Sequence, residues 1–396
     1  MLVSLWSSPS IRAAFQVSFS YRDSPSYTEG LRRRVQADFP VHALRFADPS
    51  SIVPAPRAPR VLRRLVRFGS RLLFTIPLLI YETAVLFRFF HRAPPDLVHI
   101  NNGGYPAALS ARAAAIAARI AGLPCIMVVN NLATRYNEPL RWLEYPLDRL
   151  VARSVSHFVT GSRAAADRLK ATLRLTESNC AAINNGITLR PPSETIFQTR
   201  ERLGLASFDG IVFGIVAVME PRKGHRILLE AMVELRRRHP GYFAMIRLVL
   251  EGDGPLKAEL QRFATEHDLQ QCCIFSARER NVMNLFAAID VLVLPSVGYE
   301  DFPNVVLEAM GYARAVIASR LAGIPEQIVD GETGLLVTPG NSGELAAAME
   351  RFCADPALRV RLGRSGFERF RNRFTAEAAA GKYAALYNSL IEAQST

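Results

Sequence analysis

Short apolar runs alternate with segments of helical periodicity along most of the chain, a pattern typical of parallel sheets wound by helices. In the first half it predicts strands at residues 14–20, 41–46, 97–100, 125–129, 157–160 and 181–183. Helices are expected at residues 29–37 and 107–121, and Ser162 is expected to cap a further helix. A Pro-rich stretch at residues 50–59 predicts a loop.

The second half repeats this alternation from residue 211 to about residue 352, after a linker at residues 191–195. A last amphipathic helix is expected at about residues 375–392. With 396 residues, the chain exceeds the usual length of one domain. We therefore predict an α/β protein with two Rossmann-like, doubly wound domains at residues 1–192 and 193–374, followed by a C-terminal helix at residues 375–396.

Residues 61–91 carry apolar positions at helical spacing and are flanked by arginines. The longest uncharged run, residues 72–81, is about half of what a membrane-spanning helix needs. Glu82 lies near the middle of the apolar stretch and would cost roughly 3 kcal/mol in hydrocarbon. We therefore reject a transmembrane helix, and two alternatives remain. The segment is either a basic amphipathic helix on anionic lipid or a helix that covers the first sheet.

Charge is unevenly placed along the chain. Residues 1–200 hold 26 Lys and Arg against 12 Asp and Glu, whereas residues 201–396 hold 22 against 24. A basic first half suggests an anionic partner. No zinc-finger spacing, RNA-recognition motif or helix-turn-helix pattern supports nucleic acid, so a membrane surface or a phosphorylated lipid acceptor fits better.

The cysteines and the start of the chain favour a cytosolic protein. The five cysteines are scattered without metal-ligand spacing, and no secretory signal opens the chain. We therefore expect reduced, packed thiols and a cytoplasmic location, peripheral on the inner face of the membrane.

Two carboxylates, Glu300 and Glu308, stand eight positions apart around a predicted strand, turn and helix. The strand is expected at residues 289–294, and the helix is expected to begin near Pro303. This arrangement places acceptors at the carboxyl edge of a parallel sheet, where ligands bind. Free backbone N–H groups at the start of the helix suit a phosphate, and a carboxylate suits vicinal sugar hydroxyls. Taken alone, the pair is equally compatible with two solvated surface side chains.

The absence of three ligand-binding motifs argues against several classes of enzyme. The chain has no Asp-x-Asp, no Walker A loop and no Gly-x-Gly-x-x-Gly, which argues against a metal-held diphosphate, an ATPase and a dinucleotide oxidoreductase. Without a metal, the charge of a departing diphosphate must be met by cations and helix N-termini. Lys223 is the best candidate cation, and Gly224 permits close backbone approach, whereas Arg222 and Arg226 are expected to face solvent.

The run from Pro295 to Gly311 resembles the donor-binding signature of the retaining glycosyltransferases of family four, which have the GT-B fold. Five further segments follow the family's order and spacing, at residues 214–224, 250–255, 275–278, 317–326 and 330–337. The resemblance covers residues 150–390 well and 95–150 moderately, and it is thin before residue 95.

The resemblance implies a donor cleft between the two domains and a role for each matching residue. Glu308 would accept hydrogen bonds from the ribose hydroxyls, and Glu300 would contact the transferred sugar. Asn304 and Val305 would offer backbone N–H groups to phosphate or sugar, and Arg278 would lie beside the base through its backbone. The family's C-terminal helix crosses back to the first domain, and no cofactor or metal is expected.

Gly252 and Gly254 would turn under the nucleotide, although a tight turn after a strand is their first expected role. On the acceptor side the candidates are Asn102, Gly103 and Asn130, which follow two predicted strands. The family usually has a His where Asn130 stands, and His99 is the candidate to replace it.

Other departures from the family also affect the expected function. The family's Arg five or six positions before the loop Lys is replaced by Val218 and Ala217. The family's opening strand and Gly-rich loop have no clear counterpart, because Met1 to Arg12 is similar to the end of a first helix. We therefore expect a first domain that lacks its opening strand.

The expected activity is sugar transfer from a nucleotide-sugar donor to a glycan or lipid-linked acceptor, with retention of configuration. Two alternatives remain open. One is another GT-B enzyme, such as a phosphorylase or an epimerase. The other is a family member that binds sugar nucleotide without catalysis, which the missing Arg and the Asn130 substitution favour.

Overall fold

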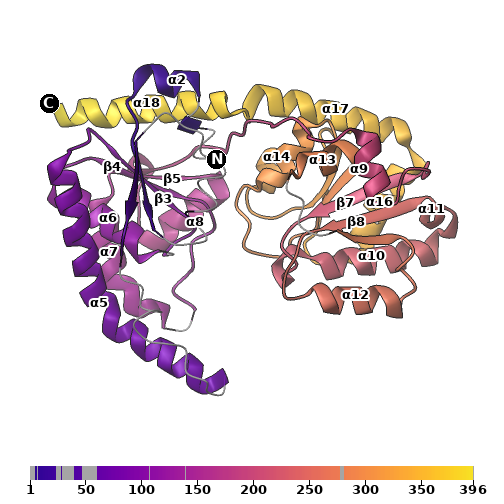
Figure 1. The fold of residues 1–396 in the computed structure, drawn as a ribbon, viewed down its shortest axis with the longest axis horizontal. Helices are drawn as coiled ribbons and strands as arrows, with labels where there is room; N and C mark the ends of the chain where they lie inside the picture. The colour runs from indigo at the N-terminus through magenta and orange to yellow at the C-terminus, as the bar shows by residue number, and fades with distance from the viewer. Residues whose placement is uncertain are drawn as a thin grey trace. The chain divides into compact units, whose positions relative to one another are not determined.

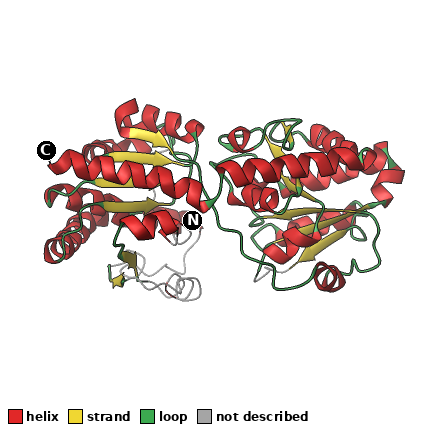
Figure 2. Ribbon diagram, turned by 90° about the horizontal axis from the view of Figure 1, so that it is seen from above, coloured by secondary structure: helices red, strands yellow, loops and turns green. Residues whose placement is uncertain are grey.

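The computed structural model describes residues 5–6, 8–23, 28, 40–46, 60–106, 108–138, 140–276 and 281–395. The chain divides into two compact units, one formed by Met1–Ile183 with Ala380–Thr396 and the other by Asn184–Ala379. Each unit has parallel strands covered by helices, which confirms the predicted α/β class (Figure 1). Figure 2 shows helices on both faces of the strands in each unit.

The first unit contains a four-stranded parallel sheet in the order β3-β4-β5-β6 and a separate parallel pair, β1-β2. The strands are β1 (Phe19–Arg22), β2 (Val41–Leu44), β3 (Val98–Asn102), β4 (Cys125–Val129), β5 (His157–Thr160) and β6 (Cys180–Ala182). β4 and β5 have the predicted bounds, because each is a continuous buried apolar run of a sheet covered on both faces. The strand expected at 14–20 forms only from residue 19, because a helix occupies residues 9–14.

Helices of the first unit cover its main sheet. They are α2 (Pro9–Ala14), α5 (Arg60–Arg92), α6 (Leu109–Ile120), α7 (Tyr145–Ser154) and α8 (Arg163–Leu173), with 3-10 turns η1 (Arg141–Glu144) and η2 (Glu177–Asn179). Ser162 caps α8 as predicted, since its side chain accepts a hydrogen bond from the backbone N–H of Ala165. The helix expected at 29–37 and the loop at 50–59 lie outside the described residues.

Helix α5 is the segment for which two alternatives were open. Its side chains Leu79, Leu86 and Phe90 lie in the core with α6, as the sheet-covering alternative predicts. Residues 74–92 are long and apolar enough to cross a membrane, a test that core helices also pass. Glu82 lies buried in this half of the helix, where desolvation raises its pKa.

The second unit has six parallel strands in the order β12-β11-β10-β7-β8-β9. They are β7 (Ile211–Val216), β8 (Ile246–Glu251), β9 (Cys273–Ser276), β10 (Val291–Leu294), β11 (Ala315–Ser319) and β12 (Leu335–Val337). Numbered within the unit, this is the doubly wound order 3-2-1-4-5-6. The winding reverses between β7 and β10, and ligands bind outside the carboxyl ends of the strands at such a switch point.

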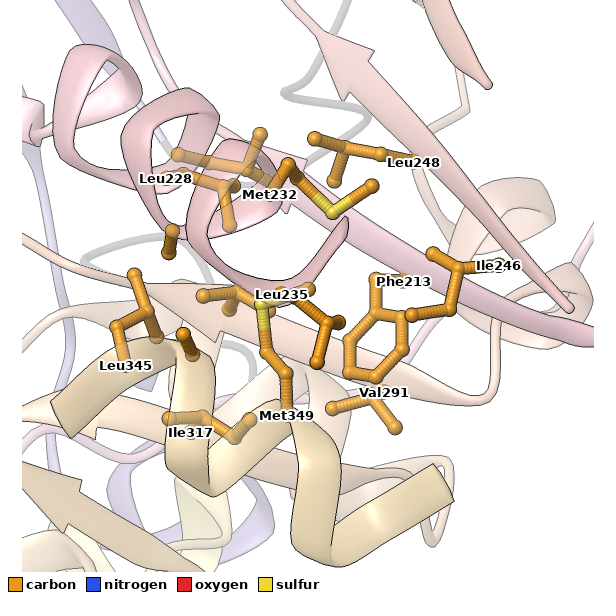
Figure 3. Close-up of a cluster of buried hydrophobic side chains, with 14 of the residues drawn as sticks. Phe213, Leu228, Met232, Leu235, Ile246, Leu248, Val291, Ile317, Leu345 and Met349 are labelled. Atoms are coloured by element: carbon orange, nitrogen blue, oxygen red, sulfur yellow. The ribbon is translucent and has the colours of Figure 1, made fainter. Parts of the chain in front are cut away.

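Helices of the second unit bury both faces of this sheet. They are α9 (Ile196–Arg202), α10 (His225–Arg238), α11 (Pro240–Ala244), α12 (Lys257–Glu266), α13 (Met283–Ala288), α14 (Asn304–Gly311), α15 (Ile324–Gln327), α16 (Ser342–Ala354) and α17 (Pro356–Arg373), with the 3-10 turn η3 (Pro221–Lys223). Figure 3 shows one core, in which Met232 and Leu235 of α10 and Met349 of α16 pack on Phe213 and Val291. Every second side chain of the strands points to this face of the sheet and packs against an apolar stripe on each covering helix.

The junction between the units lies earlier than the expected boundary after residue 192. Residues 184–192 belong to the second unit, because Ile187 is buried in its core and exchanges backbone hydrogen bonds with Phe374 and Ala376. The last helix, α18 (Ala376–Ser395), continues into the first unit. There Tyr383 and Tyr387 pack against the buried side chains of β4 and β5.

Candidate active site

The switch point of the second unit brings together two loops that are far apart in sequence. η3 follows β7 and carries Lys223, and the turn after β10 carries Ser296 and Glu300. The ammonium group of Lys223 forms an ion pair with Glu300 Oε1, and Ser296 Oγ donates a hydrogen bond of 3.0 Å to the same oxygen. Both partners are nearly buried, so the pair is screened weakly by solvent. The two predicted catalytic residues therefore meet at one point.

Arg222 also contacts this cluster, and its side chain is 33% exposed, so the expectation that it faces solvent holds only in part. Its Nη1 lies 3.5 Å from Glu300 Oε1 and donates a 3.2 Å hydrogen bond to the carbonyl oxygen of Tyr299. Its Nη2 lies 2.6 Å from Glu220. Two cations thus approach one buried carboxylate at the switch point, and Glu220 of the same loop pairs with one of them. Arg226 is exposed as expected.

Position 224 requires a glycine. Its φ of +72° is in the left-handed region, and a Cβ there would overlap the carbonyl oxygen of Pro295. The loop after β7 therefore lies directly on the loop after β10, and Val297 donates a 2.8 Å backbone hydrogen bond to Arg222. Glycine allows this approach and so holds the cations beside Glu300.

Helix α14 supplies the second carboxylate. It begins at Asn304, one residue after Pro303, which has no side chain that could cap the first turn. Asn304 Oδ1 accepts a 3.1 Å hydrogen bond from Asn185, so its side chain is held in place. The backbone N–H groups of Asn304 and Val305 lie in this first turn, where an anion would be favoured.

Glu308 lies one helical turn further on and is largely shielded from water. Burial raises the pKa of Glu308 to about 7, although the nearby Arg190 acts in the opposite direction. Tyr312, four residues later, donates a 2.7 Å hydrogen bond to the carbonyl oxygen of Arg190. Arg190 had no local signal in the sequence, because only the fold brings it to α14.

Gly252 and Gly254 have the structural role that was expected first. A Cβ on Gly252 would overlap the carbonyl oxygen of Ala217, and one on Gly254 would crowd the backbone of Met219. The loop after β8 therefore packs on the loop after β7. Their contribution to nucleotide binding stays a prediction, as does that of Arg278, which lies outside the described residues.

His225 is a buried residue of this region that the sequence reasoning missed. It is the first residue of α10, and neither ring nitrogen has a hydrogen-bond partner among the described residues. Burial, together with the charge of Lys223, lowers the pKa of His225 to about 4, so the ring is neutral at pH 7. The cationic loop therefore gains no third charge from this side chain.

The first unit gathers its polar candidates at the carboxyl ends of β3 and β4. Asn130 Nδ2 donates to Asn101 Oδ1 at 2.8 Å and to the carbonyl oxygen of Asn102 at 3.0 Å. Asn102 is buried and accepts a 3.4 Å hydrogen bond from the backbone of Ala108. Among the described residues, no atom beyond its chain neighbours lies within 4 Å of where a Cβ of Gly103 would stand. Three of the four acceptor-side candidates thus lie at one edge of the sheet.

His99 is the exception, and its proposed acceptor-side role is wrong. Its Nδ1 lies 2.6 Å from the hydroxyl of Tyr387, and its ring packs against Trp6 and Tyr383. Desolvation lowers the pKa of His99 to about 4. The side chain therefore faces α18, which covers this side of β3, and not the carboxyl edge of the sheet.

No group of three or more His, Cys, Asp or Glu side chains that could hold a metal ion occurs among the described residues. The candidate site of the second unit consists of a loop with two cations, the carboxylates of Glu300 and Glu308, and the first turn of α14. These groups are complementary to a phosphorylated ligand that also carries hydroxyls.

Two family models match the chain, one in each half. The family described as "Glycosyl transferase 4-like domain" matches residues 11–186, and "Glycosyl transferases group 1" matches residues 210–355. The chain belongs to the family-four glycosyltransferases, which have the GT-B fold. The match of this glycosyltransferase to its family begins at residue 11, so the resemblance reaches further toward the N-terminus than the motifs indicated.

Two relatives of this glycosyltransferase have names that describe different activities. 2-Deoxystreptamine glucosyltransferase of Streptomyces kanamyceticus is 26% identical over 313 residues, which are 76% of this chain and 79% of that protein. Lipopolysaccharide core biosynthesis glycosyltransferase LpsE of Rhizobium meliloti is 33% identical over 168 residues. That match covers 42% of this chain and 47% of LpsE, so it spans about half of that relative.

Solved structures share the fold of this glycosyltransferase. HepE of Anabaena, in complex with UDP, has a TM-score of 0.75 at 20% identity and covers 98% of this chain and 95% of its own. Sucrose-phosphate synthase of Thermosynechococcus elongatus has a TM-score of 0.68 at 20% identity, with 96% and 90% covered. Both likenesses are to the GT-B architecture of two Rossmann-like units.

Proposed function

We propose that this glycosyltransferase moves a sugar from a nucleotide-sugar donor to a glycan or lipid-linked acceptor, with retention of configuration. The observation that carries the proposal is the meeting of Lys223 and Glu300 at the switch point, the place where a doubly wound sheet binds its ligand. The structure of HepE in complex with UDP-glucose supports a nucleotide-sugar donor for this fold.

Each group of the site has a role in this reaction. Glu308 accepts hydrogen bonds from the ribose hydroxyls, and the first turn of α14 presents its N–H groups to phosphate or sugar. Before the donor binds, Lys223 and Arg222 share the carboxylate of Glu300. Donor binding exchanges this carboxylate for the diphosphate, and Glu300 is then free to accept hydrogen bonds from the sugar. The two cations stabilise the negative charge that develops on the leaving diphosphate.

Arg222 serves as the second diphosphate cation. Relatives of this family usually have an Arg where this chain has Ala217 and Val218. The guanidinium of Arg222 reaches the same carboxylate as Lys223, so it supplies the missing charge from a neighbouring position of the loop. The reaction then needs no metal ion.

We infer an acceptor on the cytoplasmic face of the membrane, and the charge of the first half supports this inference. The first 200 residues hold 26 Lys and Arg against 12 Asp and Glu, and α5 begins in an Arg-rich segment. An anionic lipid surface or a phosphorylated lipid carrier is complementary to this charge. The protein is accordingly a peripheral protein of the inner face.

Nucleotide binding and transfer are tested separately. Thermal unfolding is measured with UDP, GDP and ADP, and a ligand at 100 times its Kd should stabilise the protein by about 2.7 kcal/mol. The matching nucleotide sugars are then assayed for transfer, and NMR of the product gives its anomeric configuration. Stabilisation by none of the three nucleotides would contradict the donor site, and an inverted product would contradict retention.

One observation favours a non-catalytic binder as the second candidate. The amide of Asn130 stands where the family usually has a His, and both of its hydrogen bonds tie β4 to β3. A side-chain amide cannot act as a general acid or base as the His could. Stabilisation by a nucleotide without any turnover, over a broad panel of acceptors, would support this candidate.

A further inference from the structure

The turn before α7 has an inverted arrangement of polar and apolar side chains. In η1, Arg141 and Glu144 face the protein, whereas Trp142 and Leu143 are exposed. Trp142 is 61% exposed, in contrast to Trp6, the other tryptophan of the chain, which is 8% exposed. Fully burying one such side chain is worth roughly 1.5–3 kcal/mol, and the free protein forgoes part of this gain at both residues.

A buried ion network holds the turn in this orientation. Arg141 Nη2 lies 2.6 Å from Asp148 Oδ2, and both side chains are almost fully buried. The hydroxyls of Tyr105 and Tyr136 donate hydrogen bonds of 3.1 and 2.7 Å to the two oxygens of Asp148. Breaking a buried pair of this kind is costly, so the backbone of η1 is anchored from inside. The exposure of the neighbouring Trp142 is therefore a built feature of the fold.

A second ion pair completes the anchor. Arg112 of α6 lies 3.0 Å from Glu144, and Arg141 lies 3.5 Å from the same oxygen. Asp148 is thereby buried, and Glu144, which is 36% exposed, is neutralised by two arginines. The surface that remains is apolar and has little negative charge.

The exposed side chains continue along α7. Trp142, Pro146 and Leu150 follow one another at intervals of four residues, and all are exposed, as is Leu143. This spacing keeps them near one face of a helix. We call these four residues, Trp142, Leu143, Pro146 and Leu150, the α7 surface.

We propose that the α7 surface inserts into the interface of an anionic membrane. Tryptophan is enriched at the membrane interface, because its ring is apolar and its N–H group remains hydrogen-bonded. The exposed charges that flank the surface in sequence are Arg135, Glu138 and Arg153, two bases against one acid. With the positive excess of the first 200 residues, this charge favours an anionic lipid surface over a second copy of the same basic unit.

Membrane insertion of the α7 surface would hold the enzyme at the membrane on which the proposed transfer takes place. Only this role in transfer rests on the proposed function. Lipid binding by the α7 surface requires neither donor nor transfer. It also differs from lipid binding by α5, because it depends on exposed apolar side chains of another segment.

The intrinsic fluorescence of the full chain tests the proposal. Vesicles of phosphatidylcholine, with and without phosphatidylglycerol, are added to wild type and to Trp142→Ser. Trp6 is present in both proteins, so the difference between their spectra belongs to Trp142. We expect this difference to shift to the blue with anionic vesicles and the shift to weaken at high salt.

Co-sedimentation with the same vesicles measures the affinity. Trp142→Ser should weaken binding roughly tenfold or more. Phe197→Ser is the matched control, because Phe197 is 63% exposed on the second unit, and it should bind as wild type does. Calorimetry with UDP should be unchanged in Trp142→Ser, so a failure of nucleotide binding in wild type would refute the proposed function and not this proposal.

Three results would overturn it. These are the absence of a blue shift with anionic vesicles, equal binding of wild type and Trp142→Ser, and equal binding to neutral and anionic vesicles. A dimer that sedimentation velocity detects in wild type and not in Trp142→Ser, without vesicle binding, would assign the α7 surface to a second copy of the chain.

Discussion

Replacing Glu308 by Gln should stabilise the ligand-free protein above pH 7 and, at the same time, weaken its affinity for nucleotide. Burial raises the pKa of Glu308 to about 7 from an ordinary 4.5. The folded protein therefore binds this proton more tightly than the unfolded chain does. Stability is lost as the pH rises from 4.5 through about 7, because the carboxylate must then ionise inside the protein.

The magnitude follows from the two pKa values. A tenfold change in proton affinity is worth about 1.4 kcal/mol, so ionised Glu308 costs the folded state roughly 3 kcal/mol at pH 8. At pH 5 the cost falls below about 1 kcal/mol, because the folded carboxyl group keeps its proton there. Gln is uncharged at both pH values and escapes the cost. In a unit of this size each kcal/mol raises Tm by roughly 2–4 °C.

Urea unfolding of wild type and Glu308→Gln at pH 5 and pH 8 measures the effect on stability. Calorimetric titration with UDP at pH 8 measures the effect on binding, where the loss of a charge-assisted hydrogen bond should cost roughly 1.5–3 kcal/mol. Glu332→Gln is the control, since Glu332 is an exposed acid of the same unit, and it should change neither quantity. The reasoning is refuted if Glu308→Gln is no more stable than wild type at pH 8, or if the difference is the same at both pH values.

Three further predictions concern the loops at the switch point. Glu300→Gln should lower turnover and leave UDP affinity nearly unchanged, because this carboxylate is assigned to the sugar; an affinity loss equal to that of Glu308→Gln would contradict the assignment. Lys223→Ala should lower turnover more than Arg222→Ala, since Lys223 is closer to the shared carboxylate, and chelator should leave activity intact; activity lost in chelator and restored by a divalent cation would exclude this mechanism. Gly224→Ala should lower the free energy of unfolding by roughly 3 kcal/mol or more, because its Cβ overlaps the Pro295 carbonyl oxygen and its φ is strained. Gly204→Ala, at the same φ but in open space, should cost about 1–2 kcal/mol. Equal losses in urea unfolding would show that the loops after β7 and β10 separate easily.

The sequence by itself determined the class of fold and the local frame of the donor site. β4 and β5 were predicted with their observed bounds, because a continuous apolar run between polar residues has few alternatives to a buried strand. α14 begins beside Pro303 as expected, since proline suits the start of a helix and disrupts its interior. Glu300 and Glu308 were identified because strand, turn and helix are contiguous in the chain.

Contacts between distant segments were decided only by the tertiary structure. Lys223 and Glu300 are 77 positions apart, and they meet because the sheet reverses its winding between β7 and β10. The same packing brings Arg222 to the shared carboxylate.

The tertiary structure also decides which way a polar side chain faces. His99 turns toward α18, because a helix from the far end of the chain covers that side of β3. Trp142 is exposed because Arg141 and Glu144 find buried partners on other helices. Local periodicity encodes whether a residue can be buried, but the order of strands and the helices that cover them decide what each buried or exposed group contacts.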